Sequence, residues 1–416
     1  MDNGTILALA GPAANTNDVL AEILKTGAQR MLADAIEAEV ESYIQEHAQL
    51  RDADGRRLVV RNGSMPERLL ETPIGSMRVN QPRVNDRRVD EAGNRERFSS
   101  QILPPYLRRT KSVDDLVPWL YLRGISTSDF TEFLQKLTGS QAATLSPTTV
   151  VRLKEVWQKD YEAWSKRSLK GKQYVYFWVD GIHVNVRLTD ERQCLLVIIG
   201  ATMSGEKELI AVHDGVRESA QSWKEVLLDL KSRGLEQAPR LAIGDGALGF
   251  WSALPKVFSS TRAQRCWFHK TGNVLNYLPK GTQPQAKRDI QAIWMAETKV
   301  DAEKGFDLFD AKYGAKYEKA VACLKKDRDE LLAFYDFPAE HWRHLRTTNP
   351  IESTFATIRL RHRRTKGSGS RLACLTMMFK LAELAQSHWR KLNGSQLLAD
   401  VILGVQFKDG IKVAAA

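Results

Sequence analysis

The chain has few cysteines and no long apolar run. Its four cysteines are scattered along 416 residues, at Cys194, Cys266, Cys323 and Cys374. This spacing does not suggest a disulfide framework and suits a reducing cytosol. No window approaches about 18 unbroken apolar residues, so no membrane span is expected. The first residues carry no Lys or Arg before a short apolar patch, so no signal peptide is expected and the predicted location is the cytoplasm.

Acidic side chains are outnumbered by basic ones. The chain has 61 Lys and Arg against 50 Asp and Glu, a formal net charge of +11. An excess of this kind favours association with a polyanion such as nucleic acid. The 43% hydrophobic and 27% charged residues are typical of a globular protein, and the length allows two or three domains.

The N-terminal part divides into two segments that differ in composition and in hydrophobic pattern. Residues 1–55 are predicted to be a helical segment, because apolar residues recur at three and four between about 18 and 48. They fit an amphipathic helical pair or a dimer contact. Residues 56–110 are predicted to be a small Arg-rich β module, with turn signals at Asn62-Gly63 and Ile74-Gly75.

Arginine dominates the charge of this second segment. Residues 56–111 hold thirteen Lys and Arg, twelve of them Arg, against six Asp and Glu. The planar guanidinium forms bidentate bonds to phosphates and base edges, which favours DNA contact. A solvated charged face is the alternative. The candidate DNA-binding residues here are Arg61, Arg83, Arg87 and Arg88.

Residues 111–170 are predicted to be a helical region resembling a helix-turn-helix. Short helices are expected at 112–124, 126–134 and 147–154, the last after the capping pair Ser146-Pro147. Arg152 and Lys154 would face outward to DNA. An ordinary pair of packed helices has the same pattern.

From residue 171 the pattern becomes α/β. A helix is expected at 219–233, and the chain order of strands and helix is that of a ribonuclease-H-like core. Residues 171–269 form its first part in this prediction, 270–345 an all-helical insertion domain, and 346–416 its second part with a C-terminal helix from Arg371. The predicted strands are 174–179, 182–188, 194–203, 208–213 and 240–244.

Three Asp-Gly pairs follow predicted strands, at Asp180, Asp214 and Asp245. Asp180-Gly181 between two strand-like runs is a strong signal for a tight hairpin turn. Carboxylates at strand ends also suit divalent cations that bind phosphates. The residue pattern alone does not choose among the three pairs, and turn and metal site are compatible at Asp180.

A third carboxylate follows Asn349-Pro350. Glu352 is expected in the first turn of a helix, with Arg359 seven residues on along the same face. A basic run behind a carboxylate suits a site that holds a nucleic-acid backbone. The alternative is a first-turn Glu that complements the helix dipole. The candidate DNA-binding residues are Arg359, Arg361, Arg363, Arg364 and Lys366.

Several long motifs resemble, in order, the Mutator-like transposases of bacterial insertion sequences. The resemblance extends from Arg61 to Phe407. It is densest in the segments 174–182, 217–223, 244–251, 264–270 and 341–355, which include Gly244-Asp245-Gly246 and Asn349-Pro350-Ile351-Glu352.

The resemblance implies an Asp-Asp-Glu transposase whose catalytic, metal-binding triad is Asp180, Asp245 and Glu352, with Asp214 outside it. It implies two Mg²⁺ or Mn²⁺ ions per site and double-stranded DNA as the substrate, both terminal inverted repeats and target. A homodimer or higher assembly is expected, in a bacterial cytoplasm and on the nucleoid when bound to DNA, with no membrane or small-molecule substrate. A metal-dependent nuclease without strand transfer and a non-catalytic DNA-binding regulator are the alternatives.

Three further residues are given supporting roles. Cys266 and His269 have a spacing that could serve zinc, but a structural zinc site needs two more ligands and no second pair of one Cys and one His is visible at short spacing. The family carries this motif near its active site, which favours ordering of the strand and helix beside Asp245. Trp342 is expected either to belong to the core or to stack on an unpaired base.

Overall fold

The computed structural model describes residues 19–122, 147–186, 192–246, 248–365 and 369–413. The chain forms two compact units, Met1–Thr149 and Val150–Ala416. They are described separately below. Within the described ranges, no helix is long and apolar enough to cross a membrane.

In the first unit one long helix packs on two small antiparallel sheets. The small core contains Ile36 of the helix together with Leu70 and Met77 of the strands. The apolar spacing over 18–48 produces a single helix instead of a helical pair, and its first half leaves Leu20 and Met31 exposed. The elements are α1 (Val19–Glu46), β1 (Val59–Ser64) paired with β4 (Pro82–Asp86), β2 (Arg68–Thr72) paired with β3 (Gly75–Val79), and α2 (Lys111–Leu122).

The two turn signals of this unit have different outcomes. The turn between β2 and β3 is formed as predicted, and Gly75, the first residue of β3, closes it with φ +115°. Asn62-Gly63 is not a turn, because β1 continues through it. The pairing with β4 shifts between Arg61 and Ser64, and Gly63 has φ +68°. The glycine therefore serves a β-bulge, which needs the same left-handed conformation as a turn.

Only part of the predicted helix-turn-helix lies within the residues that the structure describes. α2 matches the first expected helix, and α4 (Pro147–Ser165) begins at the expected proline. The middle helix at 126–134 and its turns lie outside the described residues.

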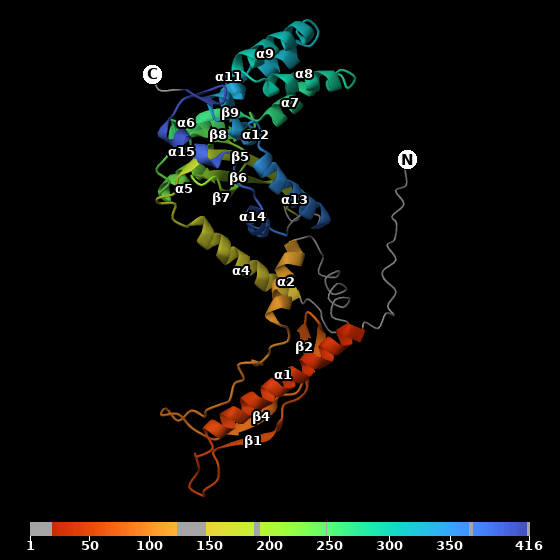
Figure 1. The fold of residues 1–416 in the computed structure, drawn as a ribbon, viewed down its shortest axis with the longest axis vertical. Helices are drawn as coiled ribbons and strands as arrows, with labels where there is room; N and C mark the ends of the chain where they lie inside the picture. Colours follow the sequence, from red (N-terminus) through yellow and green to blue (C-terminus); the bar gives the residue numbers. More distant parts are fainter. Residues whose placement is uncertain (1–18, 123–146, 187–191, 247, 366–368, 414–416) are drawn as a thin grey trace. The chain divides into compact units, whose positions relative to one another are not determined.

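The second unit is built on a mixed sheet of five strands (Figure 1). β5, β6 and β7 are antiparallel neighbours, whereas β8 runs parallel to β5 and β9 parallel to β8. In spatial order the strands are β7 (Lys207–Gly215), β6 (Arg192–Thr202), β5 (Tyr174–Asn185), β8 (Leu241–Gly244) and β9 (Arg262–Arg265).

The hairpin predicted at Asp180-Gly181 is wrong. β5 is one strand of 12 residues, and both residues pair within it, Asp180 with Val197 and Gly181 with Leu196. The strand is buried on both faces as far as Val179, so pairing and burial override the local turn preference. Asp180 therefore lies inside a strand, beside the point where the shorter β8 ends.

Helices cover both faces of the sheet. On one face, α5 (Ala220–Ser232) and α6 (Phe250–Val257) share a core with Phe177 and Val179 of β5. On the other face, the Tyr176 hydroxyl lies 2.8 Å from Nδ1 of His341 and the Trp178 indole donates to the His344 carbonyl at 2.8 Å. That face carries α12 (Trp342–Leu345), α13 (Asn349–Thr365) and α14 (Arg371–Gln386).

Between β9 and α12 every element is helical, as the periodicity predicts. α7 follows directly after the strand β9. The sequence pattern did not predict β9, because its residues Arg-Ala-Gln-Arg show no alternation of apolar and polar side chains. The helices are α7 (Trp267–Leu275), α8 (Gln283–Met295), α9 (Lys299–Tyr313), α10 (Glu318–Lys325), α11 (Arg328–Leu332) and the 3₁₀ turns Ala333–Asp336 and Ala339–His341. The chain closes with the 3₁₀ turn Ser395–Leu397, α15 (Leu398–Leu403) and the pair β10 (Phe407–Lys408) and β11 (Ile411–Lys412).

Candidate functional site

Asp180 is a buried carboxylate with an unusual electrostatic environment. Its side chain lies on the face of β5 that packs against α12 and α13, and the residue is 7% exposed. Burial raises the pKa of Asp180 to about 7, with the negative charges of Glu352 and Glu218 adding to the shift and His269 opposing it. The backbone N–H of Gly181 donates to Oδ1 at 2.8 Å and fixes the carboxylate. A carboxylate with so strongly perturbed a pKa is typical of a functional site.

Glu352 lies in the first turn of α13, as predicted. Nε2 of His269 is 3.1 Å from its Oε1, and Nη1 of Arg359 is 3.9 Å from its Oε2. The hydrogen bond from His269, and then the positive charges, hold the pKa of Glu352 below its ordinary value. The predicted shared face of Glu352 and Arg359 is confirmed.

Asp180, His269 and Glu352 converge from three elements. Their ligand atoms all lie within 4.8 Å of one another, although β5, α7 and α13 are far apart in the sequence. Carboxylate oxygens and an imidazole nitrogen form a donor set that can hold a divalent cation.

Asp245 directly follows β8. The parallel register pairs Trp178 with Ile243, so its continuation by two residues places Asp245 beside Asp180. Asp245 also contributes to the raised pKa of His269, although its own ligand atoms lie outside the 4.8 Å group. The structure thus brings Asp180 and Glu352 together and leaves Asp245 at the edge of the cluster.

Cys266 connects this site to the start of α13. The Thr348 backbone N–H lies 3.4 Å from the buried Sγ, and the Thr348 carbonyl accepts from the Glu352 N–H at 3.0 Å. The pKa of His269 is raised first by the Cys266 side chain and then by Glu352. Cys266 and His269 are therefore placed to order the helix that carries Glu352.

Asp214 and Trp342 are engaged elsewhere. Both carboxylate oxygens of Asp214 accept from Arg371, at 2.6 and 3.1 Å, which is a bidentate ion pair outside the group of Asp180, His269 and Glu352. Trp342 is 9% exposed, and its indole donates to the Phe337 carbonyl at 2.9 Å. The structure favours the core interpretation of Trp342, because no base could stack on a ring so covered.

Arg265 is a residue that the sequence pattern did not single out. Its guanidinium lies 3.9 Å above the Trp251 ring and 3.8 Å from Asp327. Nε and Nη1 are buried and donate to no hydrogen-bond acceptor within the described part of the chain. Burial lowers the pKa of Arg265, and Asp245 is among the charges that oppose this. The only sign in the sequence that Arg265 matters is its position in the segment 264–270, one of the segments that carry the family resemblance.

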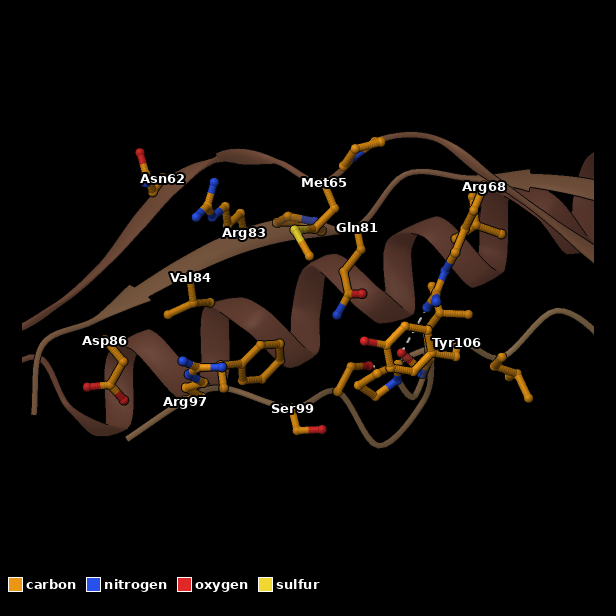
Figure 2. Close-up of a pocket in the computed structure, with 18 of the residues that line it drawn as sticks. Asn62, Met65, Arg68, Gln81, Arg83, Val84, Asp86, Arg97, Ser99 and Tyr106 are labelled. Carbon is orange, nitrogen blue, oxygen red and sulfur yellow. Dashed lines mark hydrogen bonds between the residues drawn. The ribbon is translucent and has the colours of Figure 1, made fainter. Parts of the chain in front are cut away.

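The first unit has a groove of about 1180 Å³ between β1, β4 and the segment 95–109. Figure 2 shows Arg83 on one side of the groove and Arg97 with Tyr106 on the other. Tyr106 is 93% exposed and has φ +64°, a conformation that costs a non-glycine residue about 1–3 kcal/mol. The lining arginines outnumber the lining acids; they are Arg68, Arg83, Arg95, Arg97, Arg108 and Arg109, against Glu71, Asp86 and Glu96.

The four arginines predicted to contact DNA in this unit are not equivalent. Arg83 is exposed in the groove. Arg61 pairs with Glu37, and Arg87 lies 3.9 Å from Asp52, both at the surface. Arg88 is committed to the fold, since it binds the buried carboxylate of Asp86 at 2.7 Å and the Tyr43 hydroxyl at 2.6 Å.

The basic candidates of the second unit lie on two helices. Arg152 is exposed and Lys154 half-buried on α4. Arg361, Arg363 and Arg364 lie on α13, but their side chains are outside the description. Lys366 lies beyond the described residues altogether.

Comparison with known proteins identifies the class. The profile described as "Transposase, Mutator family" matches residues 3–391, and the chain belongs to this family. The transposase for insertion sequence element IS6120 of Mycolicibacterium smegmatis is 52% identical over 298 residues, which cover 72% of this chain and 92% of that one. The transposase for insertion sequence element IST2 of Acidithiobacillus ferrooxidans is 52% identical over 287 residues, covering 67% and 95%. The expected family membership is confirmed.

Among solved structures, one match is the Drosophila P element transposase strand transfer complex. It covers 76% of this chain and 87% of that chain, at 9% identity and a TM-score of 0.28. Similarity at this level carries no argument about fold or function.

Proposed function

We propose that the protein is a DNA transposase that binds the terminal inverted repeats of an insertion sequence and catalyses metal-dependent nicking and strand transfer. The observation that carries the proposal is the convergence of Asp180, His269 and Glu352 in a member of the Mutator family. Asp180, Asp245 and Glu352 are the proposed catalytic triad.

The residues present fit a divalent metal. Asp180 and Glu352 offer carboxylate oxygens, with Asp245 next to Asp180, and hard cations prefer such ligands. Two ions of Mg²⁺ or Mn²⁺ would activate the attacking oxygen and neutralise the leaving one. The raised pKa of Asp180 supports this fit, because a buried carboxylate near other carboxylates gains from a cation.

The other side chains would position this site and the DNA. His269 fixes the Glu352 carboxylate, and Cys266 fixes the backbone from which α13 starts. The buried guanidinium of Arg265 would supply positive charge beside Asp245, where the DNA backbone would be held. No Ser or Tyr nucleophile is required, since water and then a DNA 3′-hydroxyl would attack the phosphodiester.

The sheet supports a ribonuclease-H-like core. Three antiparallel strands, a helix, then a strand that pairs parallel to the central strand β5 follow the chain order expected for that fold. In this proposal the helical segment 270–345, between β9 and α13, forms the insertion domain. The groove around Arg83 and Tyr106 is the proposed contact with the inverted repeats.

Joining two element ends requires at least two active sites, so a homodimer or higher assembly is proposed. The exposed apolar residues of the first half of α1 support a contact between copies; they are Leu20, Ile23, Leu24 and Met31. Light scattering of the purified chain, with and without end DNA, tests this, and a monomer in both conditions would contradict it.

The decisive experiment is cleavage of the element's own ends with Mg²⁺ and with chelator. Alanine at Asp180, Asp245 or Glu352 is expected to abolish nicking and leave end binding intact. Asp214→Ala is the matched control, because it removes a third Asp-Gly carboxylate that pairs with Arg371. Nicking that persists in Asp245→Ala would refute the triad.

Two alternatives give different outcomes in the same assay. A metal-dependent nuclease would nick the ends but give no joined products with a target plasmid. A non-catalytic regulator would bind the ends without Mg²⁺-dependent cleavage.

A further inference from the structure

A second group of metal-binding side chains lies on the opposite face of the sheet from Asp180. His183 on β5 pairs directly with Cys194 on β6. Because side chains alternate along a strand, His183 faces away from the side of Asp180. Directly opposed residues of an antiparallel pair have Cβ atoms about 4.5–5.5 Å apart, so the imidazole and the thiol are neighbours.

Glu218 completes the group from the loop before α5. Its carboxylate occupies the space above Gly181, where a Cβ would lie 2.3 Å from Oε1. Its backbone is held as well, because the Glu218 carbonyl accepts from the Gly249 N–H at 2.9 Å and the next residue, Ser219, caps α5. The carboxylate is thus directed to this place by both its loop and a glycine that leaves room for it.

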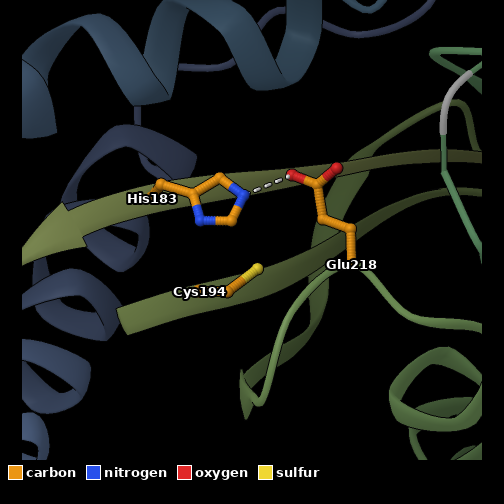
Figure 3. A group of neighbouring side chains, drawn as sticks. All are labelled: His183, Cys194 and Glu218. Carbon is orange, nitrogen blue, oxygen red and sulfur yellow. Dashed lines mark ion pairs between the residues drawn. The ribbon is translucent and has the colours of Figure 1, made fainter. Parts of the chain in front are cut away.

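The three side chains converge on one point (Figure 3). Nε2 of His183 lies 3.3 Å from Oε1 of Glu218, and all three ligand atoms lie within 4.8 Å of one another. Tetrahedral zinc, with bonds of about 2.0–2.3 Å, holds its ligand atoms about 3.3–3.8 Å apart. Small side-chain rotations would therefore bring the group to metal-binding geometry.

We propose that His183, Cys194 and Glu218 form a binding site for a transition-metal ion of the zinc type. A thiolate and an imidazole select Zn²⁺ or Co²⁺ over Mg²⁺, which prefers oxygen. Binding would release the thiol proton to solvent. Three protein ligands leave a fourth position, which faces solvent on the side where the His183 side chain is 44% exposed.

The ion would join the loop before α5 to the central strands. It would hold β5 and β6 together just beyond Asp180 while remaining on the other face of the sheet from the proposed catalytic cluster. The ordinary alternative is an ion pair between His183 and Glu218 beside a core thiol, which binds no metal.

Absorption of Co²⁺ by the chelator-treated full-length protein tests the site. A thiolate ligand gives an intense charge-transfer band in the near-ultraviolet and tetrahedral geometry gives strong visible bands. Cys194→Ser is expected to abolish the charge-transfer band, whereas Cys266→Ser, the matched control at the other cluster, retains it. Glu218→Gln and His183→Ala should weaken Co²⁺ binding by about tenfold or more. Loss of a residue that merely hydrogen-bonds to a metal ligand already costs about tenfold, and these two residues are proposed as ligands themselves. His388→Ala, at an exposed histidine, should not.

The proposal is overturned if the wild-type protein gives no charge-transfer band, or if Cys194→Ser leaves it unchanged. Loss of the band in Cys266→Ser instead would place the ion at the other cluster and also overturn it. If Cys194→Ser fails to fold, Glu218→Gln decides, because it changes a partly exposed loop residue. The readout does not depend on DNA cleavage, so it stands or fails separately from the transposase activity.

Discussion

The contact between His269 and Glu352 gives the sharpest test of how the proposed site is organised. In the structure the imidazole is 3.1 Å from the carboxylate, and both side chains are 24% exposed. A hydrogen bond to a charged group at such a site contributes about 1.5–3 kcal/mol. If His269 holds Glu352 in its working position, His269→Ala should slow nicking by about 10- to 150-fold, since about 1.4 kcal/mol corresponds to a factor of ten.

Single-turnover nicking of labelled end DNA, at saturating protein, measures this effect. The equilibrium binding of the ends should stay unchanged, because His269 would act on the carboxylate and not on DNA affinity. The Mg²⁺ concentration needed for half-maximal nicking should rise, which a merely structural role would not produce. His388→Ala is the control. Nicking by His269→Ala within twofold of wild type, or an equal loss of end binding, would refute the reasoning.

Three further predictions concern stability and binding. Gly249→Ala should destabilise the second unit by about 3 kcal/mol, because its Cβ would lie 2.3 Å from the backbone nitrogen of Ala220; Gly272→Ala, with nothing within 4 Å, should not lower the melting temperature. Burial raises the pKa of the Asp86 carboxyl, but the hydrogen bonds from Arg88 outweigh burial and lower this pKa from 3.8 to about 2. The pair of Asp86 and Arg88 should therefore contribute about 2 kcal/mol to the free energy of unfolding above pH about 4, and this contribution should be lost as the pH falls through about 2. Denaturant titrations of Asp86→Asn should lack this pH dependence. Tyr106→Ala should weaken end binding by about 1–3 kcal/mol in gel-shift titrations, if the exposed ring stacks on a base; unchanged affinity would remove it from the interface.

Elements with a regular apolar pattern were predictable. The strand starting at Tyr174, the helix starting near Ser219 and the helical run after β9 all follow from periodicity, because burial of one face or both decides such elements. The first-turn position of Glu352 followed from Asn349-Pro350, a local signal for a helix start.

Elements decided by pairing were not predictable from local preference. Asp180-Gly181 has the composition of a turn, yet pairing with β6 keeps it extended. Asn62-Gly63 has the same composition and becomes a bulge. β9 is polar and short, and it exists because β8 offers it an edge with unpaired backbone groups.

The sequence by itself determined which carboxylates to consider and, through its long family motifs, the class of protein. It could not determine their neighbours. The approach of His269 to Glu352, the buried guanidinium of Arg265 beside Asp245, and the group of His183, Cys194 and Glu218 depend on strand register and helix packing. These contacts join residues from distant segments, so no local pattern encodes them, and only the assembled sheet with its covering helices brings their side chains within reach.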